Sequence, residues 1–336
     1  MLDIYELKYR LVVMSESGAQ YNIKDFAEKI GWEQNDGELA TRISFTVKNN
    51  TIPDIKKKIS EIVKPGCLVM IYAECSGTKG EVARGYVSKW RPVLSNSKTK
   101  FEVTAYDELY NLQKSQEMIY YSSGAGTKTV LMRIFGDWGI PVGKYNGPDV
   151  KHGKLAYKTE MLSDVIKKVF DDAKKKGGGK AFVRADEGKV SVLRWGDNDP
   201  VYAFTTSTTK EVSHTISTET MITRVKIIGK EPKEGRPPVE AVLNGKTQFG
   251  IRQKIYTRGE DETASEAQTA AQEIINASGK EKTEIAVQGP DVPFIKKGDK
   301  VHIKAGSLNG YYFVKGIQHD ADTGSMKMNL AKEDDL

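Results

Sequence analysis

The residues of this chain best suited to chemistry are an Asp-Thr-Gly-Ser stretch at 322–325, four histidines and a glycine-rich segment. The stretch matches the tetrapeptide around aspartic protease carboxylates, where two aspartates share one proton. Only one copy is present, and polar His319 and Asp320 precede it in place of an apolar strand. A calcium loop starting at Asp320 would need Glu at its twelfth position, where the chain has Ala331. Because Asp and Gly are ordinary turn formers, we expect a hairpin turn and no catalytic residue.

The histidines show no spacing typical of a metal site. His152, His214, His302 and His319 lie far apart, with no close pairing of two histidines or of histidine with cysteine. His302 and His319 could share a metal if their strands are neighbours, but we expect ordinary positions on polar faces. We therefore predict no metal ligand.

The segment Gly124–Thr129, GAGTKT, resembles a phosphate-binding loop before a helix. A P-loop needs Gly directly before the Lys, whereas Thr127 precedes Lys128 here, and the spacing after the first Gly is short. We interpret the segment as a lead-in to a helix. No Ser-His-Asp arrangement can be chosen from spacing, because spatial geometry defines a triad. The sequence thus predicts no cofactor-binding residue and offers no case for an enzyme.

Length and composition indicate a protein of two or three domains. The candidate residues above would be distributed over these domains. The chain has 336 residues, a net charge of +6, 38% hydrophobic and 29% charged residues. No apolar run approaches the roughly 20 residues of a membrane-spanning helix, and the N-terminus lacks the pattern of a signal peptide. Cys67 and Cys75 would stand about 26 Å apart along one strand, so we expect two thiols in a reducing cytoplasm.

Short alternating segments predict a mainly antiparallel β protein interrupted by three helices. Apolar residues at helical spacing predict helices starting near Thr127 and near Met161. Thr263, with Glu266 three residues later, predicts a capping box at the start of the third. Two of the helices fall in one stretch, which indicates a mixed α/β region there. We expect a first β-barrel over residues 1–115, an α/β middle domain over 116–205, and a second barrel over 206–336 with an inserted helix near 263–278.

An internal repeat supports this division. Residues 63–73 read VKPGCLVMIYA and residues 295–305 read IKKGDKVHIKA. After each copy come a turn, a second strand and a third alternating strand, ending near residues 105 and 330. Three strands in the same order predict two related barrels, whose turn glycines Gly66 and Gly298 are equivalent and whose Val69 and Val301 point into their cores. The alternative is two unrelated antiparallel meanders that obey the same patterning rules.

The C-terminal stretch FIKKGDKVHIKAGSLNGYYFVKGIQHDADTGSMKMNL resembles the closing strands of XkdQ-like phage tail baseplate hub proteins. TMITRVKIIGKE, from Thr220, is similar to the strand that opens the same barrel in that family. At residue level the resemblance rests mainly on positions 206–332. It implies two barrels like those of tail-tube proteins in each subunit, so that a homotrimer imitates a six-fold ring.

The resemblance further implies a structural baseplate subunit of a contractile tail, from a phage, a prophage or a phage-tail-like injection system. Its ring would join the tail tube protein to a central spike or tip protein and contact other baseplate proteins. DNA could pass through the ring. The protein would be assembled in the bacterial host cytoplasm and reside in the virion or tail-like particle.

Two other classes of function remain open. One is a tail-associated cell-wall hydrolase or protease, which needs a cleft with perturbed carboxylates or a metal. The other is a carbohydrate-binding or nucleic-acid-binding module, which needs an exposed aromatic row. The candidates for that row are Tyr72, Tyr86, Trp90, Tyr311 and Tyr312, which we expect in cores or interfaces.

Overall fold

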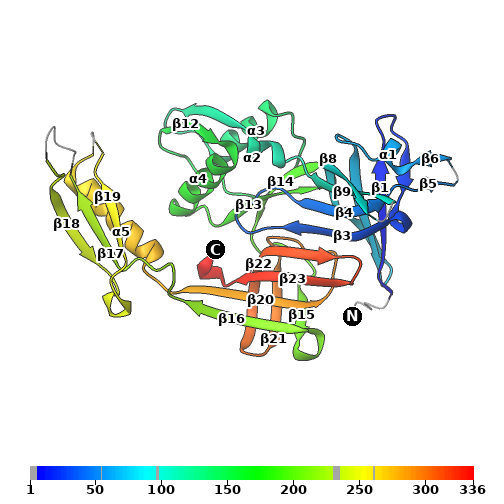
Figure 1. The fold of residues 1–336 in the computed structure, drawn as a ribbon. Helices are drawn as coiled ribbons and strands as arrows, with labels where there is room; N and C mark the ends of the chain where they lie inside the picture. The colour runs from blue at the N-terminus through cyan, green and yellow to red at the C-terminus, as the bar shows by residue number, and fades with distance from the viewer. Residues whose placement is uncertain (1–5, 54, 96–97, 230–234, 260–261) are drawn as a thin grey trace. The chain divides into compact units, whose positions relative to one another are not determined.

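Figure 1 shows the computed structural model, which describes residues 6–53, 55–95, 98–229, 235–259 and 262–336. The described chain forms two compact units. Unit 1 runs to Val212 and resumes at Ala286, and unit 2 lies between them, over Ser213–Ile285. The first residues of the expected first barrel, 1–5, lie outside the described part.

A 13-stranded sheet is the frame of unit 1, and two of its strands, β16 (Glu211–Ser217) and β20 (Lys282–Pro290), cross the boundaries with unit 2 along the chain. Its N-terminal strands are β1 (Lys8–Met14), β2 (Gln20–Asn22), β3 (Ala27–Gln34), β4 (Arg42–Lys48), β7 (Leu68–Cys75), β8 (Thr78–Ser95) and β9 (Lys98–Tyr106). Its C-terminal strands are β15 (Tyr202–Thr205), β16 (Glu211–Ser217), β20 (Lys282–Pro290), β21 (Lys300–Ala305), β22 (Leu308–Asp320) and β23 (Ser325–Ala331). The strand order is β16-β20-β23-β22-β3-β4-β9-β8-β7-β1-β2, with β21 beside β22 and β15 beside β21.

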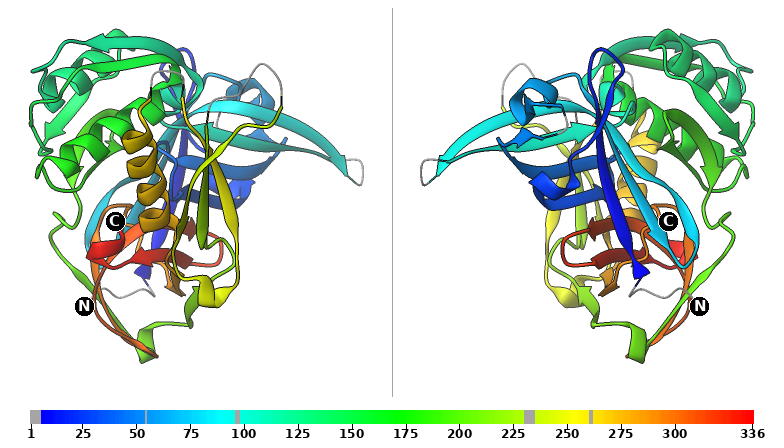
Figure 2. Two further views of the ribbon diagram at one scale, coloured as in Figure 1. Left: turned by 90° about the vertical axis from the view of Figure 1, so that its left-hand side faces the viewer. Right: turned by 90° about the vertical axis from the view of Figure 1, so that its right-hand side faces the viewer.

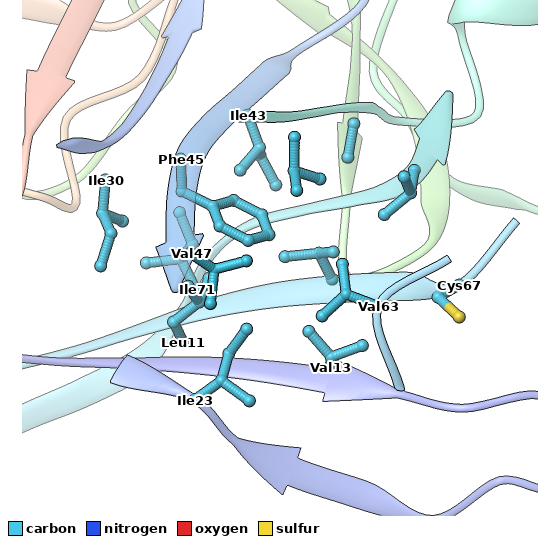
Figure 3. Close-up of a cluster of buried hydrophobic side chains, with 14 of the residues drawn as sticks. Leu11, Val13, Ile23, Ile30, Ile43, Phe45, Val47, Val63, Cys67 and Ile71 are labelled. Carbon is cyan, nitrogen blue, oxygen red and sulfur yellow. The ribbon is translucent and has the colours of Figure 1, made fainter. Parts of the chain in front are cut away.

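Alternation of apolar and polar residues gives the N-terminal strands one buried face. On β4, for example, Ile43, Phe45 and Val47 are at most 2% exposed, whereas Arg42 and Ser44 face solvent. Figure 3 shows how side chains of β1, β4 and β7 meet in this core, with Val63 and Cys67 from the turn before β7 at its edge. The small elements β5 (Thr51–Ile52), β6 (Lys57–Lys58) and α1 (Ile59–Ile62) lie between β4 and β7 in the chain.

The middle of the chain is a mixed α/β region, as the sequence predicts. Its helices are α2 (Tyr110–Lys114), α3 (Thr127–Asp137) and α4 (Leu162–Lys175), and its strands are β10 (Gln116–Tyr121), β11 (Val142–Tyr145), β12 (Leu155–Met161), β13 (Ala181–Asp186) and β14 (Lys189–Arg194). The apolar stripes of α3 and α4 bury Leu131, Ile134 and Phe135 against Val165 and Val169 in one core. The two long helices begin where the apolar spacing predicts.

Unit 2 has a small sheet and a helix of its own. The sheet order is β18-β17-β19, with β17 (Arg224–Ile228), β18 (Val239–Asn244) and β19 (Gln253–Thr257), and the helix is α5 (Ala264–Ser278). The capping box predicted at Thr263 is present: its Oγ1 accepts the Glu266 N–H, and the Glu266 carboxylate accepts the Thr263 N–H.

The expectation that Thr220–Glu231 opens the second barrel is wrong where the structure describes it. Val225 and Ile227 of β17 pack against Ala271 and Ile275 of α5, so this strand belongs to the core of unit 2. Alternation in a strand predicts that one face is buried, but it does not predict which element covers that face. Here the inserted helix α5 covers it.

The fold class is confirmed as mainly antiparallel β with α/β insertions. Among the strand pairs whose register the structure describes, β15 with β21, β11 with β14 and β17 with β19 are parallel. Among the described residues, every helix falls short of the length and apolar character needed to cross a bilayer.

The two copies of the sequence repeat, residues 63–105 and 295–330, form matching three-stranded meanders. These are β7-β8-β9, the first repeat, and β21-β22-β23, the second repeat. Gly66 and Gly298 have positive φ values of 88° and 93°, and their N–H groups bind the carbonyls of Val87 and Val314, both at 2.8 Å. As predicted, the two glycines occupy equivalent turns.

The buried positions of the two repeats also correspond. Val69 and Ile71 of the first repeat and Val301 and Ile303 of the second are fully buried. Each middle strand carries an irregularity just after its hydrogen-bonded valine, between Val87 and Lys89 in β8 and at the matching place in β22. Two unrelated meanders would not be expected to share a bulge in addition to a turn.

Candidate functional site at the junction of the two repeats

The two repeats meet where β22 pairs with β3. The register joins Ile317–Asp320 of β22 to Gly31–Gln34 of β3, antiparallel, and the Ala321 N–H binds the Ile30 carbonyl at 2.9 Å. One sheet therefore continues from the C-terminal strands into the N-terminal strands. Nothing in the sequence pattern paired these two segments.

Asp322 lies at this junction, in the turn between β22 and β23, and the turn prediction is confirmed. Its carboxylate accepts the backbone N–H of Lys29, and Oδ1 lies 3.4 Å from Lys24 Nζ. Lys29 lies near the start of β3, and Lys24 lies in the short helical turn just before this strand. The carboxylate thus binds the hairpin turn to the N-terminal strands.

His319 is buried beside Asp322 in a cluster of polar and aromatic groups. Its ring stacks on Trp32, with centroids 4.4 Å apart and planes at 10°. The ring Nδ1 of His319 lies 2.6 Å from Asp291 Oδ1, and Nε2 lies 3.1 Å from the Ile295 carbonyl oxygen. The Tyr9 hydroxyl donates a hydrogen bond to the other carboxylate oxygen, Asp291 Oδ2. Burial, together with the Asp291 carboxylate, raises the pKa of Tyr9.

A chain of hydrogen bonds continues across the junction. The Lys297 N–H donates to Gln34 Oε1 at 2.7 Å, and Gln34 Nε2 donates to Thr41 Oγ1 at 3.1 Å. The Thr41 N–H donates to Asp107 Oδ2 at 2.8 Å. Burial raises the pKa of Asp107 to about 7, against the opposing effect of these donors.

Lys297 also fixes the loop that follows β3. Its Nζ donates to the carbonyls of Asn35 and Glu38, at 2.8 and 2.6 Å. Burial lowers the pKa of Lys297 to about 8, although the nearby carboxylates of Asp36 and Glu38 oppose this shift.

An ionic cluster ties the turn of the second repeat to the middle region. Arg184 of β13 donates to Asp186 at 2.9 Å and to Asp299 at 3.0 Å, and Lys296 Nζ lies 2.5 Å from Asp186. Although burial opposes it, the pKa of Asp186 is lowered by these cations. The charges are paired within the fold, which suits structural adhesion better than catalysis.

The other predicted residues do not join a common site. His302 lies on β21 opposite Tyr311, and His319 lies eight residues further along β22, which corresponds to about 26 Å. A metal shared by these two histidines is therefore excluded by geometry. Among the described residues, no group of three or more potential ligands gathers as a metal site would require.

The sequence did not reveal a buried Thr-His-Asp arrangement in the middle region. Thr127 Oγ1 lies 2.8 Å from His152 Nε2, and His152 Nδ1 lies 2.6 Å from Asp172 Oδ2. This is the order of a nucleophile, a base and an orienting acid. Thr127 is 0% exposed and His152 2%, however, and the Thr hydroxyl also contacts the Val150 carbonyl. The arrangement ties α3 to α4 and offers no approach to a substrate.

The glycine-rich segment is a lead-in to α3, as predicted. Asp149 occupies the start of the helix, where its Oδ1 accepts the Lys128 N–H at 3.1 Å. A Cβ on Gly126, the residue before the helix, would lie 2.6 Å from the same oxygen. A carboxylate therefore already holds the position that a phosphate would take in a P-loop.

The aromatic residues proposed for a carbohydrate row do not form one. Tyr311 is 62% exposed, whereas its neighbour Tyr312 is 4% exposed and points to the opposite face of β22. Trp90 stacks on Phe101 within the first repeat.

A model of the protein family described as YQBQ-like matches residues 30–332. The chain belongs to the YQBQ-like family. The match spans both repeats, the middle region and unit 2. No curated protein matches the sequence.

Solved structures show the fold that this YQBQ-like chain shares. A 43 kDa tail protein of prophage MuSo2 from Shewanella oneidensis matches with a TM-score of 0.65 at 16% identity, over 97% of this chain and 98% of that chain. A tail protein from Neisseria meningitidis MC58 matches with a TM-score of 0.65 at 13% identity, over 96% of both chains. The similarity to phage tail proteins that the sequence predicts is confirmed for the fold.

A third structure is the c3393 protein of E. coli, described as a type VI secretion component similar to the phage T4 tail proteins gp27 and gp5. The TM-score is 0.50 at 7% identity, over 99% of this YQBQ-like chain and 77% of that chain.

Proposed function

We propose that this protein is a structural baseplate hub subunit of a phage-type contractile tail. Three copies would form a ring that joins the tail tube to the spike or tip. The observation that carries the proposal is the pair of matching meanders in one chain, with equivalent turns, buried valines and bulges. Two similar modules per chain give three chains six similar positions, which suits a six-fold tube.

The proposed domains follow the repeats, with a first tube-like barrel in residues 1–115, a middle domain in 116–205 and a second barrel in 206–336 that is interrupted by unit 2 with its helix near 263–278. Partners would be other copies of the chain, the tube protein, the spike or tip protein and further baseplate proteins. The ring would be assembled in the host cytoplasm, reside in the virion or tail-like particle, and leave a passage for DNA. The structural relatives named above, which are tail or secretion proteins, support this assignment.

Negative-stain images of the purified protein test the ring, together with its mass by light scattering. We expect particles with three-fold symmetry, a central hole and the mass of three chains. A dimer, or a monomer that stays monomeric in the presence of the tube protein, would contradict the proposal.

We also propose that the chain is not an enzyme. The titratable groups in the described residues that resemble catalytic sets are paired with one another and closed to solvent, as at His152 and His319. The Asp322→Asn variant should keep ring assembly nearly unchanged and alter no cell-wall hydrolase or protease activity, measured on peptidoglycan and casein. Loss of such an activity in this variant would favour the tail-associated hydrolase.

A further inference from the structure

Strand β22 changes its neighbour halfway along. Up to Phe313 it pairs with β21, and from Ile317 to Asp320 it pairs instead with β3. The bulge after Val314 separates the two halves, and β23 covers the other edge beyond it. The second half of β22 is therefore the place where one repeat is joined to the next module.

Strand β8 is built in the same way but is left incomplete. It pairs with β7 up to Tyr86, has its bulge after Val87, and from Trp90 to Ser95 pairs with β9. The other edge of this second half meets no strand in the described part of the chain. Figure 2 shows the paired ends of β8 and β9 as a ribbon that extends from the rest of their sheet.

Strand β16 is the counterpart of β3. In the N-terminal part the strand order is β3-β4-β9-β8-β7, and in the C-terminal part it is β16-β20-β23-β22-β21. The first strand of each series, β3 or β16, therefore has the same place. It is the strand that can lie beside the second half of the middle strand, β22 or β8, of the next repeat. For β3 that neighbour is β22 of the same chain, whereas β16 is the last strand of the sheet in the described part of the chain and has one open edge there.

We propose that the open edge of β8, residues Trp90–Ser95, pairs with β16 of a second copy of this chain, in the manner in which β22 pairs with β3. This inference rests on the proposed ring and names the strands that close it. Each contact between copies would then repeat the internal junction in its backbone pairing.

The open edges of β8 and β16 both carry exposed apolar side chains, as expected for surfaces that become buried in the assembly. Trp90 corresponds to Ile317, so Leu94 corresponds to Ala321. Ala321 packs against the core of the N-terminal strands at the internal junction, whereas Leu94 is 74% exposed. On β16, Ile216 is 65% exposed. Long apolar side chains on unpaired strand edges invite pairing with another chain.

Pro92 limits what this edge can pair with. The Ala321 N–H points to β3, so alternate residues of β22, and by equivalence Trp90, Pro92 and Leu94 of β8, direct their backbone groups to the open edge. Proline has no N–H, and its position on the open side leaves the pairing with β9 intact. The junction between copies would hence have one hydrogen bond fewer than the internal one.

Disulfide trapping tests the junction in the full chain. Arg91 corresponds to Gln318 and lies between Trp90 and Pro92, whose backbone groups point to the open edge. Arg91 would therefore face β16 in a pair without backbone hydrogen bonds, and in such pairs the facing side chains approach most closely. We would combine Arg91→Cys with Cys at each of Val212, Ser213, His214 and Thr215 in turn, because a scan requires no prior register. One of these pairs should link at least tenfold more than the unmodified chain and give products up to a covalent trimer.

The matched control replaces Arg91→Cys by Glu102→Cys. Glu102 lies on β9 directly opposite Arg91, and its Oε2 lies 2.5 Å from Arg91 Nη2. It is one strand further from the open edge, so a cysteine there is out of disulfide reach of β16. Equal linking from this control would reveal random collision and overturn the proposal. A protein that is trimeric by light scattering and links at none of the four positions would overturn the junction and leave the ring. A protein that neither links nor forms trimers would overturn both.

A single substitution provides an independent test. Leu94→Lys removes an exposed apolar group, so the monomer should keep its melting temperature within about one degree. The concentration at which half the chains are trimeric should rise at least tenfold. Unchanged association would contradict the role of this edge, while Lys89→Gln, on the same strand and exposed, should leave association unchanged.

Discussion

At the scale of single residues, the polar groups buried in unit 1 bind segments that are far apart in the chain. His319 and Asp291 are 28 residues apart, and Tyr9 reaches the same carboxylate from the other end of the sequence. Each hydrogen bond of this kind contributes about 1 kcal/mol when made and costs more when one partner is lost. Their value to the fold is that they permit one alignment of β22 with its neighbours.

Asp107 predicts a pH dependence of stability. Its pKa in the folded chain is about 7, against 3.8 as the ordinary value, so the folded state binds more protons between these values. The free energy of unfolding should therefore fall as pH rises from about 4 to 7, by an amount on the order of 4 kcal/mol at most. Asp107→Asn should remove most of this slope in urea titrations at pH 5 and pH 7.5.

The control for this prediction is Asp197→Asn. Asp197 is an exposed acidic residue of the same unit, so this variant should keep the dependence of the free energy of unfolding on pH. If the Asp107→Asn protein kept the slope of the unmodified chain, burial of Asp107 would not be its cause.

At the scale of the elements, the turn before each meander decides how β7 and β21 enter the sheet. Both turns need a residue with positive φ, but their surroundings differ. A Cβ on Gly66 would meet nothing within 4 Å, whereas a Cβ on Gly298 would lie 1.8 Å from Phe182 Cζ. The second turn is thus packed against the middle region as well.

Gly66→Ala and Gly298→Ala should consequently differ in cost. Both place a side chain in the left-handed region, at about 1 to 2 kcal/mol. Only Gly298→Ala must also displace the ring of Phe182, so its free energy of unfolding should be lower by at least a further 1 kcal/mol. Chemical denaturation of the two variants measures the difference, and equal losses would contradict the packing argument.

Val301→Asp should unfold the second repeat. The valine is 0% exposed, and losing its burial costs about 1.5 to 3 kcal/mol before the charge is counted. An unpaired buried carboxylate adds several kcal/mol more. The circular dichroism melt should lose its cooperative transition or shift down strongly, and ring formation should be lost. Lys304→Asp, on the exposed face of β21, is the control that should retain both.

How much of these elements the sequence could predict depended on whether the signal was local. The stripes of α3 and α4, the capping box at Thr263 and the turn glycines are each written within a few residues, and all were predicted. The pairing of β22 with β3 joins residues nearly 300 positions apart and leaves no mark in either strand. The assignment of β17 to unit 2 and the parallel pairing of β15 with β21 were missed for the same reason.

The candidate site shows the same limit. The sequence placed Asp322 in a turn and His319 on a strand, which is correct, but the partners Asp291, Tyr9 and Trp32 come from three other segments. The Asp149 carboxylate at the start of α3 was equally invisible, although the defective P-loop spacing already argued against a phosphate site.

At the scale of the whole molecule, unit 2 has a core of its own within the second half of the chain. Val225, Ile227, Ala267, Ala271 and Ile275 form this core. The chain enters unit 2 along β16 and returns along β20, and these two strands are neighbours in the sheet. Unit 2 is therefore arranged as an insertion.

Replacing residues 218–281 by a short Gly-rich turn should leave unit 1 folded. Strands β16 and β20 would then form a plain hairpin, a connection that adjacent antiparallel strands accept readily. Thermal unfolding should stay cooperative, within a few degrees of the full chain. Aggregation, or a melt without a transition, would show that unit 1 depends on the insertion.

The fusion of two modules by the β22–β3 pairing has a consequence for assembly kinetics. Half of the six junctions in the proposed ring are made during folding of single chains, where the partners are held together at high effective concentration. Only three junctions between chains remain. Two of them form by encounters between molecules, and the third closes within a complex already formed. Open intermediates should be short-lived, and chains in limiting supply should yield complete rings and monomers with few partial rings between them.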